Sequence, residues 1–244
     1  MSMIVRGNRT TYGHRVGILM SDSRVPRIPG DPGHAETFDF PVAYAVLENF
    51  PFQDLVDIRK DHISILIDKS LELQAQGVHL IVADCGLFAP FQPEMKDALS
   101  VPFIGSALDV IPLLTRFLPT NSTIGVLTGD TRILSDRHLQ ASGINPTDVS
   151  LSGMEESEEF RKVVIDHHPE LDIEKLRQDV RTAAERFLNI DLKAVVIECT
   201  NLISFRSDIQ EILGIPVYDL VSLIEHYISG FQVRRFTSAF IADN

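Results

Sequence analysis

The two cysteines of the 244-residue chain occupy matching positions in two similar sequence segments. Cys85 stands in HLIVADCG and Cys199 in AVVIECTN, so each cysteine comes at the end of a short apolar run. An Xaa-Pro step follows each cysteine at the same spacing, at Pro102 and Pro216. Two opposed thiols can invert a carbon stereocentre, because one thiolate removes a proton from one face while the other thiol donates a proton to the opposite face. The pair therefore predicts acid–base chemistry at a carbon that carries an acidic hydrogen.

The expected position of both cysteines at strand ends is the main argument for this chemistry. In an open parallel sheet, ligands bind beyond the carboxyl ends of the strands. A helix that starts there presents free N–H groups and the positive end of its dipole. We expect both thiols to lie at such helix starts, with pKa values below that of a free thiol. The alternatives are two buried core thiols left by a duplication and a redox pair, although the sequence has no CxxC motif.

Apolar segments rich in Val and Ile indicate the strands that carry the cysteines. We expect strands at residues 16–20, 78–83, 124–127 and 194–197, and short strands beside the two Xaa-Pro steps. Helical periodicity predicts helices within residues 51–76 and 173–188, and further helices at 106–117 and 220–228. Strands that alternate with helices predict an α/β fold built from right-handed βαβ units.

The repeated pattern also predicts the domain organisation. We expect two similar Rossmann-like lobes with parallel sheets, related by pseudo-twofold symmetry, with the active site in the cleft between them. The first-cysteine lobe is expected at residues 16–118 and the second-cysteine lobe at residues 122–219. The C-terminal helix, within residues 220–244, is expected to complete the first lobe.

Charge and composition narrow the kinds of partner. The net charge of −12 and the lack of a Lys- and Arg-rich cluster argue against nucleic acid. No apolar run approaches the roughly 20 residues that span a bilayer, and the first residues lack the apolar core of a signal peptide. These features predict no membrane partner and a cytoplasmic location. Asp166, His167 and His168 resemble part of a metal site, but adjacent histidines rarely converge, so no metal is expected.

Polar residues after the second-lobe strands are candidates for holding a substrate carboxylate. Thr128, Gly129 and Thr131 follow one strand, where such a turn can simply cap a helix or can bind an anion with its N–H groups. Thr200 and Asn201 follow the second cysteine and are expected to act from the other side.

The first strand leads into a loop rich in Pro and Gly that carries further candidates. Asp22 could orient a substrate amino group or cap a turn. Arg24 and Arg27 could clamp a carboxylate with two hydrogen bonds, or could be solvated loop charges. Residues 25–41 form a loop long enough to act as a lid.

An acidic residue directly precedes each cysteine, Asp84 in the first segment and Glu198 in the second. Adjacent side chains of a strand point to opposite faces, and a nearby anion would raise the pKa of a thiol. We therefore expect a structural, hydrogen-bonding role for both carboxylates.

The sequence around the cysteines resembles the aspartate/glutamate racemase superfamily. Cys85 in VADCG and Cys199 in VIECTN resemble the two signature cysteines of that group, and the Cys-Thr pair that includes Thr200 is the most specific local match. The resemblance covers residues 16–230. It implies two α/β lobes, a catalytic cleft between them, no cofactor and a homodimer or higher homo-oligomer.

Two departures distinguish the chain from glutamate racemases. The first strand leads to Ser21-Asp22-Ser23 where glutamate racemases have Asp-Ser-Gly, and residues 25–41 resemble a little-characterised, racemase-like branch. Gly86 and Leu87 follow the first cysteine where glutamate racemases have Asn and Thr, so Gly86 is expected beside the substrate while glutamate itself is disfavoured.

The predicted function is a racemase or epimerase of an amino acid or a related small carboxylate, independent of pyridoxal phosphate and of any other cofactor. Maleate-type isomerisation and arylmalonate-type decarboxylation on the same scaffold are alternatives, and so is a noncatalytic carboxylate-binding protein. Phe88, Phe91 and Phe205 lie near the cysteines and are candidates for an apolar pocket wall or for the core.

Overall fold

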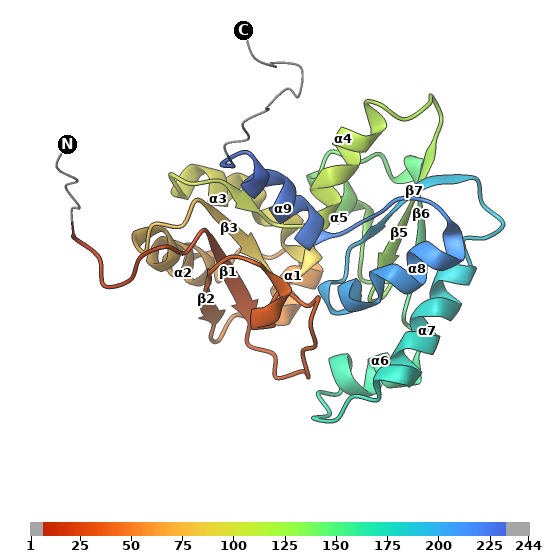
Figure 1. Ribbon diagram of the computed structural model, residues 1–244, viewed down its shortest axis with the longest axis horizontal. Helices are drawn as coiled ribbons and strands as arrows, with labels where there is room; N and C mark the ends of the chain where they lie inside the picture. The colour runs from red at the N-terminus through yellow and green to blue at the C-terminus, as the bar shows by residue number, and fades with distance from the viewer. Residues whose placement is uncertain (1–6, 233–244) are drawn as a thin grey trace, which may run out of the picture.

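Two parallel four-stranded sheets form the framework of residues 7–232, the part of the chain that this computed structural model describes. In Figure 1, β1, β2 and β3 lie in one half of the molecule, and β5, β6 and β7 lie in the other. The strand orders are β2-β1-β3-β4 and β6-β5-β7-β8. The strands are β1 (Val16–Ser21), β2 (Val42–Leu47), β3 (Leu80–Ala83), β4 (Phe103–Ile104), β5 (Thr123–Thr128), β6 (Val149–Gly153), β7 (Leu192–Ile197) and β8 (Val217–Tyr218). The repeated order confirms the predicted fold class, an α/β protein with two similar lobes.

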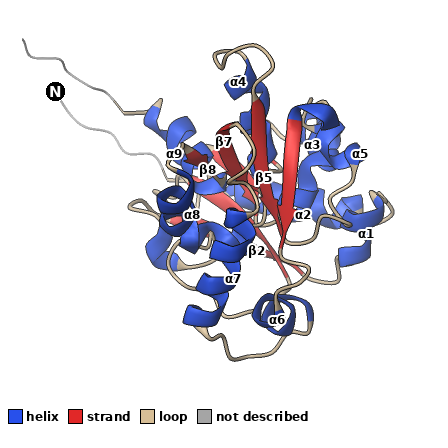
Figure 2. Cartoon of the chain, turned by 90° about the vertical axis from the view of Figure 1, so that its right-hand side faces the viewer, coloured by secondary structure: helices blue, strands red, loops and turns tan. Residues whose placement is uncertain are grey.

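Helices flank both sheets, as Figures 1 and 2 show. The α-helices are α1 (Phe52–Asp57), α2 (Ile63–Ala75), α3 (Gln92–Ala98), α4 (Ile111–Thr115), α5 (Asp136–Ala141), α6 (Glu158–Phe160), α7 (Ile173–Glu185), α8 (Arg206–Leu213) and α9 (Leu220–Ser229). The 3₁₀ helices are η1 (Ala35–Thr37), η2 (Gly86–Phe91), η3 (Ala107–Val110), η4 (Pro146–Asp148) and η6 (Thr200–Phe205), and η5 (Arg161–Ile165) is a π-helical turn. Within residues 7–232, none of the helices has the length and apolar character needed to span a membrane.

The inner strands are largely apolar because both of their faces are covered. Every residue of β3 is buried, and in β1 Ile18 and Leu19 are fully buried. Gly17 lets α2 pack closely on β1, since a Cβ atom at that position would lie 3.0 Å from the Cβ atom of Leu73. The first sheet and α2 therefore share one tightly packed core.

Leu73→Ala is expected to lower the free energy of unfolding by about 3 kcal/mol, because it leaves a cavity against β1. Leu71, on the same helix but 38% exposed, provides the matched control. Leu71→Ala should change the free energy of unfolding by no more than about 0.5 kcal/mol. Urea unfolding of both variants measures the difference, and equal effects would contradict this description of the core.

The predicted elements mostly coincide with the observed ones, with two kinds of difference. The four long predicted strands correspond to β1, β3, β5 and β7, and the strands at the Xaa-Pro steps to β4 and β8, but β2 and β6 were not predicted. The two predicted helical stretches of the first lobe are each divided. Ile58 adopts a left-handed conformation that ends α1 before α2 begins, and Pro112 stands in the first turn of α4 after the separate segment η3.

The C-terminal helix contacts the first lobe. α9 packs against η3, and the Tyr227 hydroxyl donates a hydrogen bond to the His79 carbonyl oxygen at 3.5 Å. The ring of Phe231 stacks on the ring of His79, with centroids 4.8 Å apart. α9 ends at Ser229, and residues 233–244 of the predicted C-terminal helix lie outside the described residues. The lobe boundaries and the oligomeric state stay predictions.

Candidate active site

A cavity of about 410 Å³ lies between the two lobes at the carboxyl ends of their inner strands. The segments that follow β1 and β3 line it from the first lobe, and those that follow β5 and β7 line it from the second. Helix α1 and the α6–η5 segment supply the remaining walls. This is where a parallel sheet places its ligands, and the volume suits a small organic acid.

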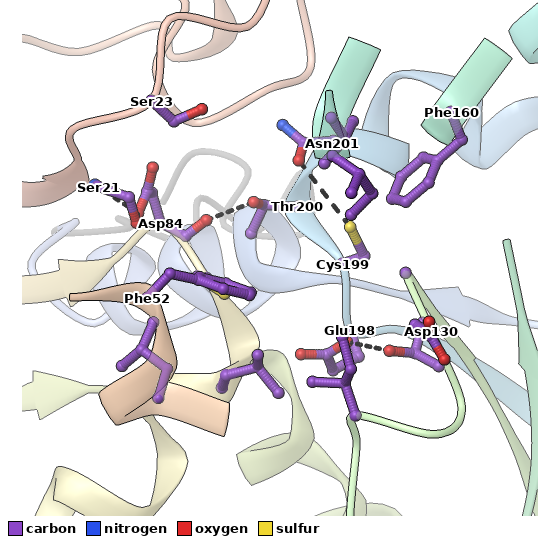
Figure 3. A pocket seen from close by; sticks show the side chains of 18 of the residues that line it. Ser21, Ser23, Phe52, Asp84, Asp130, Phe160, Glu198, Cys199, Thr200 and Asn201 are labelled. Atoms are coloured by element: carbon purple, nitrogen blue, oxygen red, sulfur yellow. Dashed lines mark hydrogen bonds between the residues drawn. The ribbon is translucent and has the colours of Figure 1, made fainter. Parts of the chain in front are cut away.

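Both cysteines line this cavity, one from each lobe. Cys85 has an extended backbone conformation directly before η2, and Cys199 has one directly before η6. The backbone N–H of Leu87 donates toward the Cys85 sulfur, and that of Asn201 donates toward the Cys199 sulfur. The Asn201 side-chain oxygen also lies 4.0 Å from the Cys199 sulfur (Figure 3). Each lobe therefore presents a thiol at a helix start, as the sequence predicts.

The expectation of low thiol pKa values is wrong. Burial raises the pKa of Cys85 well above that of a free thiol, and the carboxylates of Glu198 and Asp84 raise it further. Burial, then Glu198, likewise raises the pKa of Cys199. The N–H groups at the helix starts oppose these effects but do not overcome them, so both groups are neutral thiols at neutral pH.

The carboxylates that precede the cysteines are hydrogen-bonded at equivalent places in the two lobes. Asp84 accepts hydrogen bonds from the backbone N–H and the hydroxyl of Ser21, at 2.9 and 2.8 Å. Glu198 accepts one from the Thr128 hydroxyl at 2.6 Å, and burial raises the pKa of Glu198 to about 7. The predicted hydrogen bonding is present, but both carboxylates also line the cavity, which the strand alternation did not suggest.

The loop after β1 connects the two lobes beside the cavity. Arg27 donates hydrogen bonds to Asp31 at 2.7 Å and to Asp84 at 3.1 Å. Asp31 also accepts one from the Asn201 side chain at 3.0 Å, and the Thr200 hydroxyl donates to the Asp84 carbonyl oxygen (Figure 3). Arg27, Thr200 and Asn201 line the cavity, yet these side chains are engaged in contacts within the protein. Their predicted contact with substrate stays a prediction.

The same loop makes a close backbone contact with the second lobe. Gly30 has a φ of +107°, and a Cβ atom there would lie 2.7 Å from the Cα atom of Ser204 in η6. A glycine at this position permits the close approach. Whether residues 25–41 move as a lid stays a prediction.

The other predicted substrate-binding residues divide into two groups. Asp22, Thr128 and Gly129 line the cavity. Thr131 lies outside the lining, and its hydroxyl donates to Glu155 at 2.8 Å. Gly86 also lies outside the lining and faces Glu198, whose Oε1 atom would be 2.1 Å from a Cβ atom at Gly86.

Three aromatic residues that the sequence analysis did not select form part of the apolar wall of the cavity. Phe50 and Phe52 line it from the first lobe and Phe160 from α6. The candidates Phe88, Phe91 and Phe205 are fully buried and lie in the core instead. Phe50 stands in Phe-Pro-Phe and Phe160 in an acidic segment far along the chain, so only the folded chain brings them together.

Charged groups in the lining are mostly acidic. Asp22, Asp130 and Glu198 join Asp84, which is paired with Arg27, the one Lys or Arg residue of the described lining. His167, which is exposed, also lines the cavity. Within residues 7–232 no three His, Cys, Asp or Glu side chains gather as metal ligands would. An acidic cavity with aromatic walls favours a ligand with a compact positive charge.

Comparisons with known proteins give one family and several relatives. A family model described as Asp/Glu/hydantoin racemase matches residues 50–224, more than half of the chain. A dimethylsulfoniopropionate lyase from Durusdinium sp. clade D is 28% identical over 88% of this chain and 74% of the lyase. Four dimethylsulfoniopropionate lyases from Emiliania huxleyi are 23–29% identical, and the chain spans 34–67% of their length.

Solved structures with the same fold are more distant in sequence. A glutamate racemase from Bacillus anthracis is 16% identical with a TM-score of 0.60, over 90% of this chain and 82% of the racemase. Unliganded arylmalonate decarboxylase is 13% identical with a TM-score of 0.57, over 91% of this chain and 94% of the decarboxylase. These similarities support the fold.

Proposed function

The chain belongs to the Asp/Glu/hydantoin racemase family, a family of enzymes, and from this premise we propose that it is a cysteine-dependent lyase of a sulfonium carboxylate such as dimethylsulfoniopropionate. The observation that carries the proposal is a cavity in which two thiols share their surroundings with surplus carboxylates and aromatic rings. The similarity to dimethylsulfoniopropionate lyases over 88% of the chain supports the same choice.

The proposed reaction is an elimination that needs one proton acceptor. A cysteine thiolate removes a proton from the carbon next to the substrate carboxylate, and the thiol forms. The electron pair of the broken C–H bond becomes the second bond of a carbon–carbon double bond. The carbon–sulfur bond breaks and its electron pair leaves with sulfur, which gives neutral dimethyl sulfide and acrylate. General base catalysis of such a step typically contributes about 10²–10⁴-fold in rate.

The charge of the cavity supports a substrate with a positive group. Glu198 and Asp84 raise the pKa values of both thiols, so a sulfonium placed among these carboxylates would offset their charge and favour thiolate formation. Phe50, Phe52 and Phe160 line the same cavity, and their rings would contact the methyl groups of the cation. A dicarboxylate would add negative charge to an acidic cavity, which disfavours the malonate and maleate reactions.

Ser23 and His167 are our candidates for holding the substrate carboxylate. Both line the cavity, and neither side chain is hydrogen-bonded to another residue within 7–232. Figure 3 shows Ser23 on the first-lobe side of the site, apart from Glu198 and Cys199. This arrangement would place the carboxylate away from Glu198, the acidic residue of the second lobe that would receive the sulfonium.

Racemisation of a small amino acid is the second candidate, because the cavity contains one thiol from each lobe. A two-base mechanism uses both thiols, and the ammonium group of an amino acid also suits an acidic cavity. Exchange of the α-proton in D₂O distinguishes this candidate from elimination. A carboxylate-binding protein would catalyse neither reaction.

We expect the protein to release dimethyl sulfide from dimethylsulfoniopropionate, as measured by gas chromatography of the headspace. The neutral thioether 3-(methylthio)propionate is the control substrate, and it should not react, because it lacks both the positive charge and the good leaving group. The Cys85→Ser/Cys199→Ser double variant is the control protein. Absence of dimethyl sulfide with the wild type, together with α-deuteration of amino acids, would replace the lyase proposal with the racemase.

A further inference from the structure

We propose that Glu198 of the second lobe activates Cys85 of the first lobe by accepting the proton of its thiol. This inference deepens the proposed function and rests on it in one respect, that a cysteine thiolate is the base. It assigns the base to Cys85 and gives Glu198 a role beyond its hydrogen bond to Thr128.

The carboxylate of Glu198 crosses to the first lobe at the residue that follows Cys85. One oxygen, Oε2, is fixed by the Thr128 hydroxyl at 2.6 Å. The other oxygen, Oε1, lies so close to Gly86 that a Cβ atom there would be only 2.1 Å from it. Glycine at position 86 therefore leaves the room that Oε1 of Glu198 needs to approach the first lobe. Within the described residues Oε1 accepts no hydrogen bond, so it is available to receive a proton.

Glu198 is the carboxylate that acts most strongly on Cys85. After burial, it is the largest cause of the raised pKa of Cys85, ahead of Asp84 and Cys199. Asp84 is already bonded to Ser21 and Arg27, which reduces its capacity to accept a proton. Glu198 has no cationic partner within residues 7–232. Of the two buried carboxylates, Glu198 is therefore the better acceptor.

The proton transfer keeps the charge of the cavity constant. The S–H bond of Cys85 breaks, its electron pair stays on sulfur, and an O–H bond forms at Oε1 of Glu198. One anion replaces another, whereas loss of the proton to water would leave two anions in a buried site. The thiolate then removes the substrate proton and returns to the thiol. Glu198 releases its proton to water after the products leave, which balances the elimination.

The pKa of Glu198 supports this role. Burial raises it to about 7, closer to that of a thiol, so the transfer costs less than it would to an ordinary carboxylate. The groups that face Glu198 are Thr128 on its own lobe, Cys199 next in the chain, and Cys85 across the cleft. Only ionised Glu198 can accept a proton, so activity should rise with pH through about 7.

Glu198→Gln tests the proposal in a Cys199→Ser background, where Cys85 is the remaining thiol. The amide can keep the hydrogen bond from Thr128 but cannot accept the thiol proton. Loss of the negative charge should move the pH profile of Cys85 alkylation by iodoacetamide to lower pH. Turnover of dimethylsulfoniopropionate should nevertheless fall about 100-fold in kcat with a small change in KM. Gly86→Ala, which displaces Oε1, should likewise move the alkylation profile of Cys85 to lower pH and reduce kcat.

Glu155→Gln is the matched control, because Glu155 accepts a hydrogen bond from Thr131 but lies outside the cavity. It should leave both the alkylation profile and kcat unchanged. An unchanged alkylation profile in Glu198→Gln would overturn the proposal, and so would an unchanged or higher kcat. The alkylation measurement needs no substrate. A wild type that releases no dimethyl sulfide would therefore refute the lyase function, while the alkylation profile would still decide whether Glu198 and Cys85 are coupled.

Discussion

Cys85→Ser is expected to lower kcat/KM for release of dimethyl sulfide about 1,000-fold, which is within the usual range for loss of a general base. A serine hydroxyl is a far weaker acid than a thiol and does not ionise beside Glu198. The side chain keeps nearly the same volume, and Cys85 is only partly buried, so the fold should be retained. Steady-state kinetics measure the loss, and the thermal unfolding midpoint serves as the check on folding.

Cys199→Ser is the matched control, since Cys199 occupies the equivalent position before η6. Elimination needs a single base, so we expect this variant to lose about tenfold or less in kcat/KM. Two-base racemisation would instead require both thiols. Equal, large losses in both variants would contradict the assignment of the base to Cys85.

Arg27→Leu is expected to lower the free energy of unfolding by about 4 kcal/mol, because it leaves two buried carboxylates without their cation. The guanidinium group of Arg27 contacts Asp31 and Asp84, whose side chains are each 3% exposed. Asp31 also receives the hydrogen bond from Asn201 of the second lobe. Urea unfolding measures the stability, and activity should fall as well because the two lobes lose this connection.

Arg132→Leu provides the control for a surface ion pair. Arg132 also contacts an aspartate, Asp130, but its side chain is 72% exposed. Such pairs typically contribute no more than about 1 kcal/mol. If the two arginine variants had similar stabilities, the Arg27 contacts could not be a structural connection between the lobes.

The inner strands could be predicted from the sequence because they are continuous apolar segments. β1, β3, β5 and β7 are covered on both faces, and this burial leaves a clear pattern. The edge strands β2 and β6 pair on one side only. The sequence VSLSG of β6 is half polar, and the burial of β2 is irregular, so neither has the pattern of an inner strand.

The cysteine pair could also be predicted, because its position depends on strand ends and on the internal repeat. The rest of the cavity depends on how the two lobes pack. Oε1 of Glu198 reaches Gly86 across the cleft, and Phe160 joins Phe52 only in the folded chain. The glycine after the first cysteine was the available signal for Glu198, since a small residue can mark a close approach.

The type of reaction is harder to infer than the fold. Two opposed cysteines suggested racemisation, whereas the lyase proposal depends on the acidic lining and on the similarity to dimethylsulfoniopropionate lyases. One scaffold can direct the same proton removal toward inversion or elimination. The substrate decides between them, because elimination requires a leaving group on the neighbouring carbon.

Proton NMR in D₂O tests the central claim most directly, that a cysteine base in this cavity removes the proton next to a carboxylate and a sulfide leaves. The protein would be incubated with dimethylsulfoniopropionate and a set of L-amino acids in one tube, beside a second tube that contains Cys85→Ser. We predict vinyl signals of acrylate and the methyl signal of dimethyl sulfide with the wild type, unchanged α-proton signals of the amino acids, and almost no reaction with Cys85→Ser. Loss of amino-acid α-protons without acrylate would contradict the account and support racemisation.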